Sequence, residues 1–472
     1  MKVKLILPAL TEAKSPFFRP IKYSLFPPLG LATLAGYLSP SDQVVLQDEH
    51  VETLDLEDHP DLVVIQVYIT SAFRAYELAD HYRRCGAHVC LGGLHVTSLP
   101  DEAAHHADTI FLGPGEDTWP RFLQDFRAGL PGKRYESTVR TLTGVPRPRR
   151  DLIQRRLYLA PNSIVVSRGC PHTCDFCYKE AFFQGGRSFY TQAVDEALSE
   201  IDSLPGRHLF FLDDNLFGNR RFASSLFSGM QGMGRLWQAA ATVDAVLRPN
   251  LVEQAVASGL RSLFVGFESL TPGNLAAQGK RQNLGHDYAQ AVRRLHDLGV
   301  MVNGSFVFGM DEDDATVFDR TVEWAVSQGI ETATFHILTP YPGTTLYQRM
   351  SAAGRMTTSN WNLYDTRHTV FHPARMTGEQ LEAGYWRAYQ KFYSWRSILR
   401  SSCIQDDPIE RLRHLAYVGA WKKCEPLWDM VIRARRLTNF MPVLESVLAS
   451  FERNPSTSTD PVTADTALYP LS

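Results

Sequence analysis

The chain has 472 residues, 44% of them hydrophobic and 21% charged, with a formal net charge of −3. This length predicts more than one domain. The near-neutral charge gives no electrostatic reason to expect binding to nucleic acid or to an acidic membrane. No segment approaches the roughly 18 apolar residues of a membrane span, and the amino terminus lacks the apolar run of a secretory signal. Seven cysteines without framework spacing argue against a disulfide scaffold. These features predict a cytoplasmic enzyme or binding protein, with no nucleic-acid partner and no membrane span.

Short apolar runs alternate with helical stretches over the first part of the chain. Strand composition is found in "KVKLILPA", "QVVLQDE", "DLVVIQVYI", "HVCLGG" and "DTIFLGPGE". Helical spacing of apolar residues is found in segments such as "AFRAYELADHYRRCG". Such alternation predicts a parallel sheet with helices on both faces. We expect a doubly wound, Rossmann-like domain over residues 1–130, followed by a solvated proline- and arginine-rich linker over 131–162.

The alternation resumes at Ser163 and gives six further strand–helix units. The strands are expected in "SIVVSRG", "HLFFLDDN", "LWQAAATV", "SLFVGFES", "MVNGSFVFG" and "TATFHILTP". We therefore predict a partial (β/α)6 TIM barrel over 163–375, in which function collects at the carboxyl ends of the strands. A helical region is expected over 376–452, where Thr377 and Gln380 have the spacing of a capping box. The polar, proline-bearing stretch 453–472 is expected to be disordered.

Three cysteines, Cys170, Cys174 and Cys177, follow directly on the first predicted barrel strand. Glycine and proline in the same stretch place them on a loop at the carboxyl end of that strand. Three thiolates on one loop can serve a zinc ion, a disulfide relay or an iron–sulfur cluster. Structural zinc normally takes four ligands, and the other four cysteines lie in other predicted domains. His172 as a fourth zinc ligand stays open as an alternative.

The stretch "CPHTCDFC" resembles the CxxxCxxC motif of the radical S-adenosylmethionine (SAM) superfamily, and Phe176 supplies the aromatic residue that commonly precedes its last cysteine. The resemblance extends over about residues 1–395 through "LGGLHVTSLPDEA", "PRRDL", "FFLDDNLFGN", "VGFES" and "ILTPYPGT". It is similar to the subfamily with an N-terminal B12 (cobalamin)-binding domain. The resemblance implies a [4Fe–4S] cluster held by the three cysteines, with SAM bound to the open iron and cleaved by an electron from the cluster.

Polar residues at the predicted strand ends are further candidates. Asp213, Asp214 and Asn215 form either a turn with a helix cap or a polar wall near SAM or substrate. The resemblance implies that Glu268 helps to hold SAM. The candidate catalytic residues are Asp213, Glu268 and His336. The candidate cofactor contacts in the barrel are Phe176, Asp214, Asn215, Glu268, Asn303 and Ser305.

Three other features carry open alternatives. His336 is interpreted equally well as a substrate contact or as a core histidine whose ring nitrogens are hydrogen-bonded within the protein. Arg168, beside the cysteines, either pairs with a carboxylate or caps its strand. The segment around Asp365 and His368 resembles the part that closes the barrel mouth in relatives.

Glycine turns are predicted at the carboxyl edge of the first sheet, where open parallel sheets bind ligands. The candidate cobalamin contacts there are Gly92, Gly93, Gly115 and Glu116, although plain turn glycines explain the pattern equally well. No G-x-G-x-x-G follows the first strand, so a dinucleotide motif is absent. The D-x-H-x-x-G loop of well-known cobalamin modules is also absent. "DEHVET" contains the D-x-H of Asp48 and His50 but lacks the glycine, and we interpret it as coincidence.

The resemblance leads to one favoured function and two rivals. We predict a radical SAM enzyme, most simply a cobalamin-dependent methyltransferase acting on an unactivated carbon or phosphorus of a small molecule, such as a specialised metabolite or lipid precursor. A flavodoxin or ferredoxin is the expected electron donor. The first rival lacks cobalamin, keeps a vestigial B12-like domain, and cyclises or oxidises a metabolite or transfers a 3-amino-3-carboxypropyl group. The second is a zinc-stabilised binding protein that does not turn over SAM.

Overall fold

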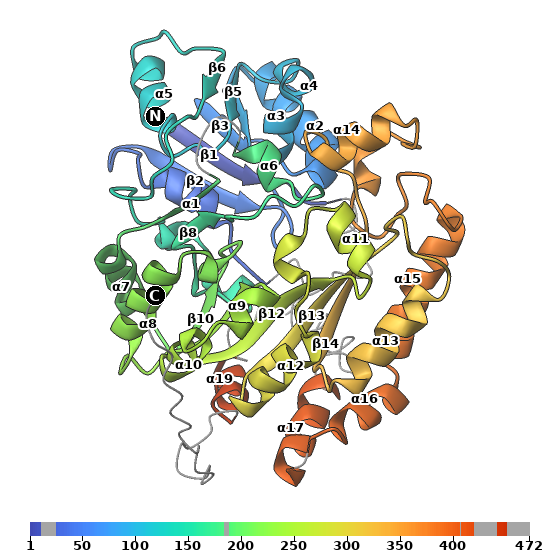
Figure 1. The fold of residues 1–472 in the computed structure, drawn as a ribbon. Coiled ribbons are helices and arrows are strands. Elements are labelled where there is room, and N and C mark those ends of the chain that lie inside the picture. Colours follow the sequence, from blue (N-terminus) through green and yellow to red (C-terminus); the bar gives the residue numbers. More distant parts are fainter. Residues whose placement is uncertain (11–24, 184–187, 406, 420–440, 451–472) are drawn as a thin grey trace, which may run out of the picture.

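The computed structural model describes residues 1–10, 25–183, 188–405, 407–419 and 441–450 (Figure 1). The predicted disordered stretch 453–472 and part of the predicted C-terminal helical region lie outside these residues. Two parallel α/β units, one from each half of the chain, lie one above the other in Figure 1, and helices from the end of the chain flank the second unit. The predicted fold class is thereby confirmed.

The first unit is a six-stranded, fully parallel sheet in the order β2-β1-β3-β4-β5-β6. Its strands are β1 Lys2–Leu7, β2 Gln43–Asp48, β3 Leu62–Gln66, β4 His88–Gly92, β5 Thr109–Leu112 and β6 Arg134–Glu136. Its helices are α1 Leu29–Ala35, α2 Ala72–Arg84, α3 Leu94–Ser98, α4 Pro100–Ala104 and α5 Trp119–Arg127. Because β1 lies between β2 and β3, the strand order reverses there, and this reversal is the place where doubly wound sheets bind ligands.

The alternation of side chains along β1 explains why both faces of this sheet are covered. Leu5 packs into one buried cluster with Trp119 of α5, whereas Ile6 packs into another with Leu78 of α2. Successive residues of a strand point to opposite faces, so a strand that is apolar at both positions needs helices on both sides. The apolar runs that predicted these strands therefore also required the two helical layers.

The first sheet continues past the predicted boundary at residue 130. Strand β6 pairs with β5, and Tyr135 within it is buried and stacks on Phe111 with ring centroids 5.4 Å apart. A strand of three residues is too short to show a pattern in the sequence. The linker after β6 is also less solvated than expected, since Arg150 donates to Glu200 at 2.9 Å and to the Ser163 carbonyl at 2.7 Å.

The second unit is the predicted partial barrel, with six parallel strands in the order β14-β13-β12-β11-β10-β7. The strands are β7 Ser163–Ile164, β10 His208–Phe211, β11 Leu236–Ala241, β12 Leu260–Glu268, β13 Met301–Phe308 and β14 Thr332–Ile337. The connecting helices are α6 Lys179–Phe182, α7 Val194–Ser203, α8 Arg220–Met230, α9 Val243–Leu247, α10 Leu251–Ala257, α11 Pro272–Ala277, α12 Tyr288–Asp297, α13 Val317–Ser327 and α14 Thr345–Ala352. The sheet leaves β7 and β14 as edges, so the barrel is open.

The predicted strand "SIVVSRG" is divided in the structure. After β7 the chain bends, and β8 Ser167–Gly169 pairs antiparallel with β9 Phe189–Thr191 in a separate two-stranded sheet. The Asp213 carboxylate accepts hydrogen bonds from the backbone N–H groups of Val166 and Ser167, which removes both donors from the barrel sheet. Gly169 has a φ of 76°, and an added Cβ would collide with the Ser188 carbonyl. This bend sets the direction in which the cysteine loop leaves the barrel.

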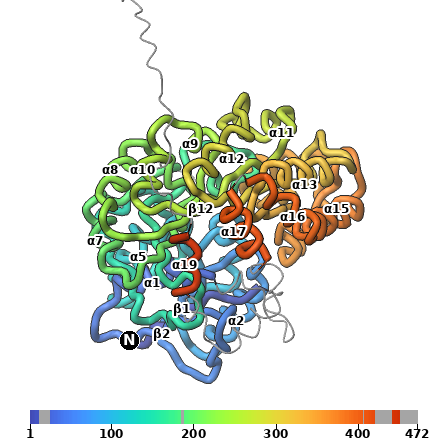
Figure 2. Tube along the Cα trace, turned by 90° about the horizontal axis from the view of Figure 1, so that it is seen from below, coloured from blue at the N-terminus to red at the C-terminus, as the bar shows by residue number. Residues whose placement is uncertain are grey.

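Four described helices follow the barrel: α15 Gly378–Phe392, α16 Trp395–Ser402, α17 Pro408–Val418 and α19 Met441–Ala449. Of these, α15 covers the edge at β14, whereas α19 packs against β11 and β12. The predicted capping box of Thr377 and Gln380 is confirmed at the start of α15. Tyr389 of α15 and Tyr393, which directly follows this helix, accept hydrogen bonds from β14 N–H groups, at 3.1 Å and 3.0 Å, and so satisfy an edge that would otherwise be open. Helices α15 and α16 lie against α13 (Figure 2).

In the described part of the chain, no helix is both long enough and apolar enough to cross a membrane.

Candidate functional site

The carboxyl edge of the first sheet faces the barrel, and two cavities open between them. The first has a volume of about 510 Å³ and is lined by strand-end residues such as Leu7 and Asp48 together with Tyr341 and Thr366 from after the barrel. The second has a volume of about 460 Å³. The two cavities adjoin, because five residues line both of them: Leu7, Phe26, Tyr68, Leu94 and Tyr178. A continuous space of this size at the carboxyl edge of a doubly wound sheet fits a large ligand.

The three cysteines of the loop between β8 and α6 lie beside these cavities. Cys170 and Cys174 are buried, and Cys177 is half-buried and directly precedes Tyr178, which lines both cavities. Two side-chain amides approach the sulfurs: Asn215 Nδ2 lies 3.4 Å from Cys170 Sγ, and Gln282 Nε2 lies 3.4 Å from Cys174 Sγ. Two of the three thiols therefore have a side-chain amide donor beside them.

The donor set fits an iron–sulfur cluster better than a single ion. Among the described residues, no three His, Cys, Asp or Glu side chains close around one point as a single metal ion requires. In an iron–sulfur cluster each iron binds one thiolate, so the cysteine sulfurs lie further apart than the ligands of a single metal ion do. Burial raises the pKa of the Cys177 thiol to about 11, and metal binding would have to displace that proton.

The three polar residues after β10 hold the cysteine loop in different ways. Asp213 is buried, and its carboxylate accepts hydrogen bonds from the Val166 N–H and the Ser167 hydroxyl, so it faces the bend between β7 and β8. Burial raises the pKa of Asp213 to about 7. Asp214 accepts from the Gly169 N–H at 2.9 Å and from the Tyr178 hydroxyl at 2.9 Å.

Asn215 differs from its two neighbours, because it contacts a cysteine directly. Its Nδ2 donates toward Cys170, while its buried Oδ1 has no hydrogen-bond partner in the structure. An unsatisfied buried acceptor beside the cysteine loop is a position where a ligand can donate. This geometry supports the prediction that Asn215 contacts a cofactor.

Glu268 ends β12 in a strained conformation, with a φ of 62° and a register shift against β13. Its carboxylate forms an ion pair of 2.7 Å with Lys280, and both side chains are almost fully buried. Burial alone would lower the pKa of Lys280, but Glu268 and the thiolate of Cys174 together raise it above its ordinary range. A positive φ at a non-glycine residue is uncommon and is often found at functional sites.

Three further candidate residues lie on the strands after β12: Asn303 and Ser305 on β13, and His336 on β14. Asn303 accepts a hydrogen bond from the Thr334 hydroxyl at 3.4 Å, and Ser305 is buried. His336 Nδ1 lies 3.2 Å from the Thr366 hydroxyl, and burial lowers its pKa, so the neutral ring is favoured. Thr366 lines the first cavity, whereas His336 does not and reaches it only through its contact with Thr366.

Phe176 is accounted for by packing. It is partly buried against the hydrophobic core of the barrel. This contact fixes the backbone between the second and third cysteines, whether or not the ring also reaches a cofactor.

The candidate cobalamin contacts fall into two groups. Gly93 lines the second cavity and has a φ of 117°. A Cβ added to it would lie 2.9 Å from the Val67 carbonyl oxygen, so only glycine fits there. Neither cavity is lined by Gly92, Gly115 or Glu116. Glu116 forms an ion pair with Arg168, which directly precedes the cysteine loop, so this carboxylate joins the two units. Of the two alternatives for Arg168, the structure shows the ion pair with a carboxylate.

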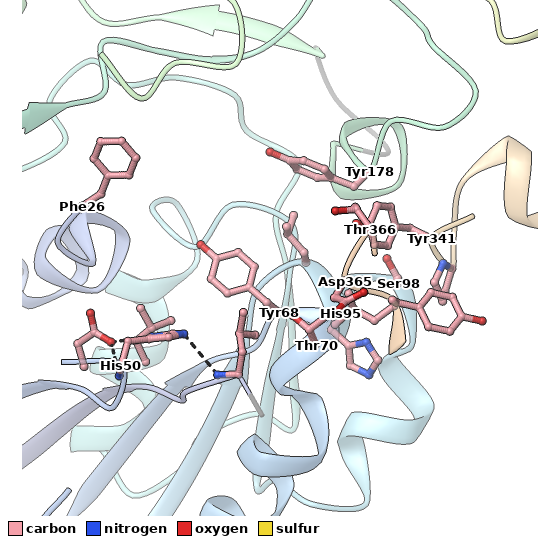
Figure 3. A pocket seen from close by; sticks show the side chains of 17 residues that line it. Phe26, His50, Tyr68, Thr70, His95, Ser98, Tyr178, Tyr341, Asp365 and Thr366 are labelled. Atoms are coloured by element: carbon pink, nitrogen blue, oxygen red, sulfur yellow. Dashed lines mark hydrogen bonds and ion pairs between the residues drawn. The ribbon is translucent and has the colours of Figure 1, made fainter. Parts of the chain in front are cut away.

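The D-x-H of Asp48 and His50, interpreted as coincidence, lies in the wall of the first cavity (Figure 3). His50 Nδ1 lies 2.8 Å from Asp48 Oδ1, and the other Asp48 oxygen accepts from the Tyr158 hydroxyl at 3.0 Å. Figure 3 places His50 and Phe26 on one side of the cavity and Tyr341 and His95 on the other. The sequence placed this dyad at a strand end but could not show that the strand end borders a cavity.

The segment around Asp365, which resembles the part that closes the barrel mouth in relatives, borders the first cavity. Asp365 and Thr366 line the first cavity, and Asp365 forms an ion pair of 3.0 Å with His368.

Sequence reasoning missed Lys280 and Gln282, which lie between α11 and α12. The signal available was the polar run "GKRQN" on a connection that follows the carboxyl end of a barrel strand, where function is expected.

The comparisons with known proteins agree with this geometry. The family model of the Radical SAM superfamily matches residues 164–325, which include the cysteine loop. The chain is 28% identical over 386 residues to the bacteriochlorophyllide d C-12(1)-methyltransferase of Chlorobaculum tepidum, covering 79% of this chain and 84% of that protein. It is 27% identical over 391 residues to the bacteriochlorophyllide d C-8(2)-methyltransferase of the same organism, covering 79% and 86%.

Among solved structures, the chain shares its fold with the radical S-adenosylmethionine methyltransferase TsrM from Kitasatospora setae, with cobalamin and a [4Fe–4S] cluster bound. The TM-score is 0.60 at 15% sequence identity, and the alignment covers 93% of this chain and 99% of that one. Both α/β units are therefore part of the shared architecture.

Proposed function

We propose that the chain is a radical SAM enzyme, because the family model of that superfamily matches residues 164–325, and that it is a cobalamin-dependent methyltransferase that acts on an unactivated carbon of a small molecule. The observation that carries the proposal is the position of the cysteine loop: Cys177 leads directly into Tyr178, which lines both cavities beneath a doubly wound domain. The curated relatives are named as methyltransferases, and the solved structure of similar fold holds both cobalamin and a [4Fe–4S] cluster.

When bound, the cluster supplies the electron that cleaves SAM, and cobalamin supplies a carrier for the methyl group. The residues proposed to hold the cluster are Cys170, Cys174 and Cys177. SAM is assigned to the polar residues at the adjoining strand ends: Asp214, Asn215, Glu268, Asn303 and Ser305. Asp213 is reassigned from catalysis to positioning, because its carboxylate is already taken up by the bend before the cysteine loop.

Cobalamin is assigned to the second cavity, and the substrate to the first cavity, which adjoins it. Gly93 places its backbone in the wall of the second cavity. The ion pair between Glu116 and Arg168 holds that domain against the cysteine loop. His336 is kept as a substrate-side candidate, since its partner Thr366 lines the first cavity.

The first cavity favours a largely apolar substrate. Its wall carries the rings of Phe26, Tyr68, Tyr341 and Tyr364, and no lysine or arginine is among its lining residues in the described part of the chain. Aromatic walls with few polar groups bind apolar ring systems well. The relatives are named for bacteriochlorophyllide d, a substrate of this kind, so we assign carbon rather than phosphorus as the methyl acceptor.

The reaction needs an external one-electron donor and a reducing compartment. We propose a flavodoxin or ferredoxin as the donor and the cytoplasm as the location, because free thiol ligands persist in a reducing compartment.

The proposal is tested by product analysis under anaerobic conditions. The protein is incubated with cobalamin, dithionite, SAM labelled in its methyl group, and bacteriochlorophyllide d as a first acceptor. We expect S-adenosylhomocysteine, 5′-deoxyadenosine and a labelled acceptor. Methylthioadenosine in place of these products would instead establish the rival 3-amino-3-carboxypropyl transfer.

A pair of cysteine variants controls the experiment. Cys177→Ala is expected to abolish cleavage of SAM, whereas Cys403→Ala, at an exposed cysteine outside the loop, is expected to leave it unchanged. Equal activity of the two variants contradicts the assignment of the cysteine loop.

A further inference from the structure

We propose that Lys280 and Gln282 raise the reduction potential of the cluster held by the cysteine loop. The inference rests on the proposed function, because it requires that the loop holds an iron–sulfur cluster. It concerns residues 278–283, between α11 and α12, which we call the tuning segment. Nothing in the cysteine motif itself points to this segment.

The tuning segment is fixed against the cysteine loop by backbone contacts. The Asp175 N–H donates to the Gln278 carbonyl at 3.0 Å. Gly279 has a φ of 65°, and an added Cβ would lie 3.0 Å from the Thr173 carbonyl oxygen, so the two backbones are in close contact. Arg349 closes the arrangement by donating to Asp175 at 2.8 Å and to the Gln278 side chain at 3.3 Å.

Lys280 places a buried positive charge near the second and third cysteines. Lys280 follows Gly279, whose backbone contacts the Thr173 carbonyl, and it precedes Gln282, whose Nε2 lies 3.4 Å from Cys174 Sγ. Glu268, its ion-pair partner at 2.7 Å, brings a negative charge to the same region. Lys280 belongs to the segment whose backbone contacts the cysteine loop, whereas Glu268 ends β12, so the pair presents its positive member to the cysteines.

Gln282 adds a hydrogen-bond donor to the same cysteine. Its Nε2 lies 3.4 Å from Cys174 Sγ, while Asn215 Nδ2 lies at the same distance from Cys170 Sγ. Donors to sulfur ligands, positive charge and exclusion of water are among the properties that set the potential of an iron–sulfur cluster. Two of the three cysteines thus carry a donor, and one of these is also close to a cation.

The sign of the effect follows from the charge change on reduction. One electron from an external donor, dithionite in the assay, enters the cluster, and no bond in the protein forms or breaks. The reduced cluster carries one more negative charge, which Lys280 and the N–H donors stabilise. In a buried site this stabilisation is large, because the surroundings screen the charges only weakly.

The experiment measures the potential directly. The anaerobically purified protein, without SAM, is titrated with dithionite, and the reduced cluster is followed by electron paramagnetic resonance. We expect Lys280→Met to lower the equilibrium constant for reduction at least tenfold, which is 59 mV for a one-electron couple. Glu268→Gln is expected to shift the potential in the opposite direction, because it removes the negative member of the pair. Gln282→Leu is expected to lower the potential by a smaller amount.

Three controls separate the inference from a general loss of structure. Lys280→Arg keeps the charge and is expected to keep the potential close to that of the wild type. Lys391→Met removes a lysine from another ion pair of similar length, 2.8 Å to Asp319 on the surface of α15 and α13, and is expected to leave the potential unchanged. The double variant Lys280→Met/Glu268→Gln avoids an unpaired buried carboxylate and is expected to retain a lowered potential.

The outcomes distinguish this inference from the proposed function. Lack of a four-iron cluster in the wild-type protein overturns the proposed function and, with it, the inference. A wild-type cluster whose potential is the same in Lys280→Met and Lys391→Met overturns the inference alone. A shift of the same sign in Lys280→Met and Glu268→Gln also overturns it, because opposite charges then act alike.

Discussion

The Asp213 carboxyl group makes the fold sensitive to pH. It is buried, and burial raises its pKa from the ordinary 3.8 to about 7, although Val166 and Ser167 donate hydrogen bonds to it. The folded protein therefore holds a proton on this group more tightly than the unfolded chain does. Its stabilising contribution is complete below about pH 4 and is lost as the pH rises through about 7.

The size of this effect follows from the two pKa values. A rise from 3.8 to about 7, at 1.36 kcal/mol per pH unit, amounts to ~4 kcal/mol over the whole range. Between about pH 5 and about pH 8 the expected change is ~3 kcal/mol. Asp213→Asn removes the titration and keeps an oxygen for Ser167, because the substituted amide has nearly the same shape.

Urea unfolding of the wild-type protein and Asp213→Asn, matched in cluster content, measures the prediction at several pH values. The free energy of unfolding of the variant, relative to wild type, is expected to increase by ~3 kcal/mol from about pH 5 to about pH 8. Parallel pH profiles would refute the reasoning, because they would mean that the buried carboxyl group titrates alike in the folded and unfolded states.

Two further substitutions test the contacts that position the cysteine loop. Glu116→Gln is expected to lower the free energy of unfolding by ~2 kcal/mol, because it leaves the Arg168 charge half-buried without its partner; no change in urea unfolding contradicts this role. Gly279→Ala is expected to reduce iron content after reconstitution, because its Cβ would press on the Thr173 carbonyl. Gly285→Ala is the matched control, since Gly285 has a similar φ of 74° with nothing near its added Cβ; equal iron loss in both variants would show that strain alone is responsible.

The architecture was predictable because its signals are local. Each main strand is an apolar run bounded by polar or glycine residues, and six such runs after Ser163 suffice for a partial barrel. The cysteine loop was predictable for the same reason, since its three ligands fall within one short stretch. The capping box at Thr377 likewise depends only on residues three positions apart.

The details that differ depend on contacts between distant residues. The chain bends after β7 because Asp213, far along the chain, takes the N–H groups of Val166 and Ser167. Glu268 was predicted at the site, but its partner Lys280 lies beyond an intervening helix. Charges along a sequence do not reveal which of them will pair when buried. For the same reason, the sequence does not show that Asp48 and His50 border a cavity, because the opposite wall includes residues from after β14.

The central claim is that one chain holds an iron–sulfur cluster in the cysteine loop and cobalamin in the neighbouring domain. Counting iron, cobalt and zinc in a single anaerobic preparation, supplied with cobalamin during reconstitution, tests it most directly. The account predicts about four irons and about one cobalt per chain, with little zinc. Iron without cobalt contradicts the methyl-transfer proposal and leaves a cobalamin-independent radical SAM enzyme. Zinc without iron after reconstitution contradicts the account as a whole.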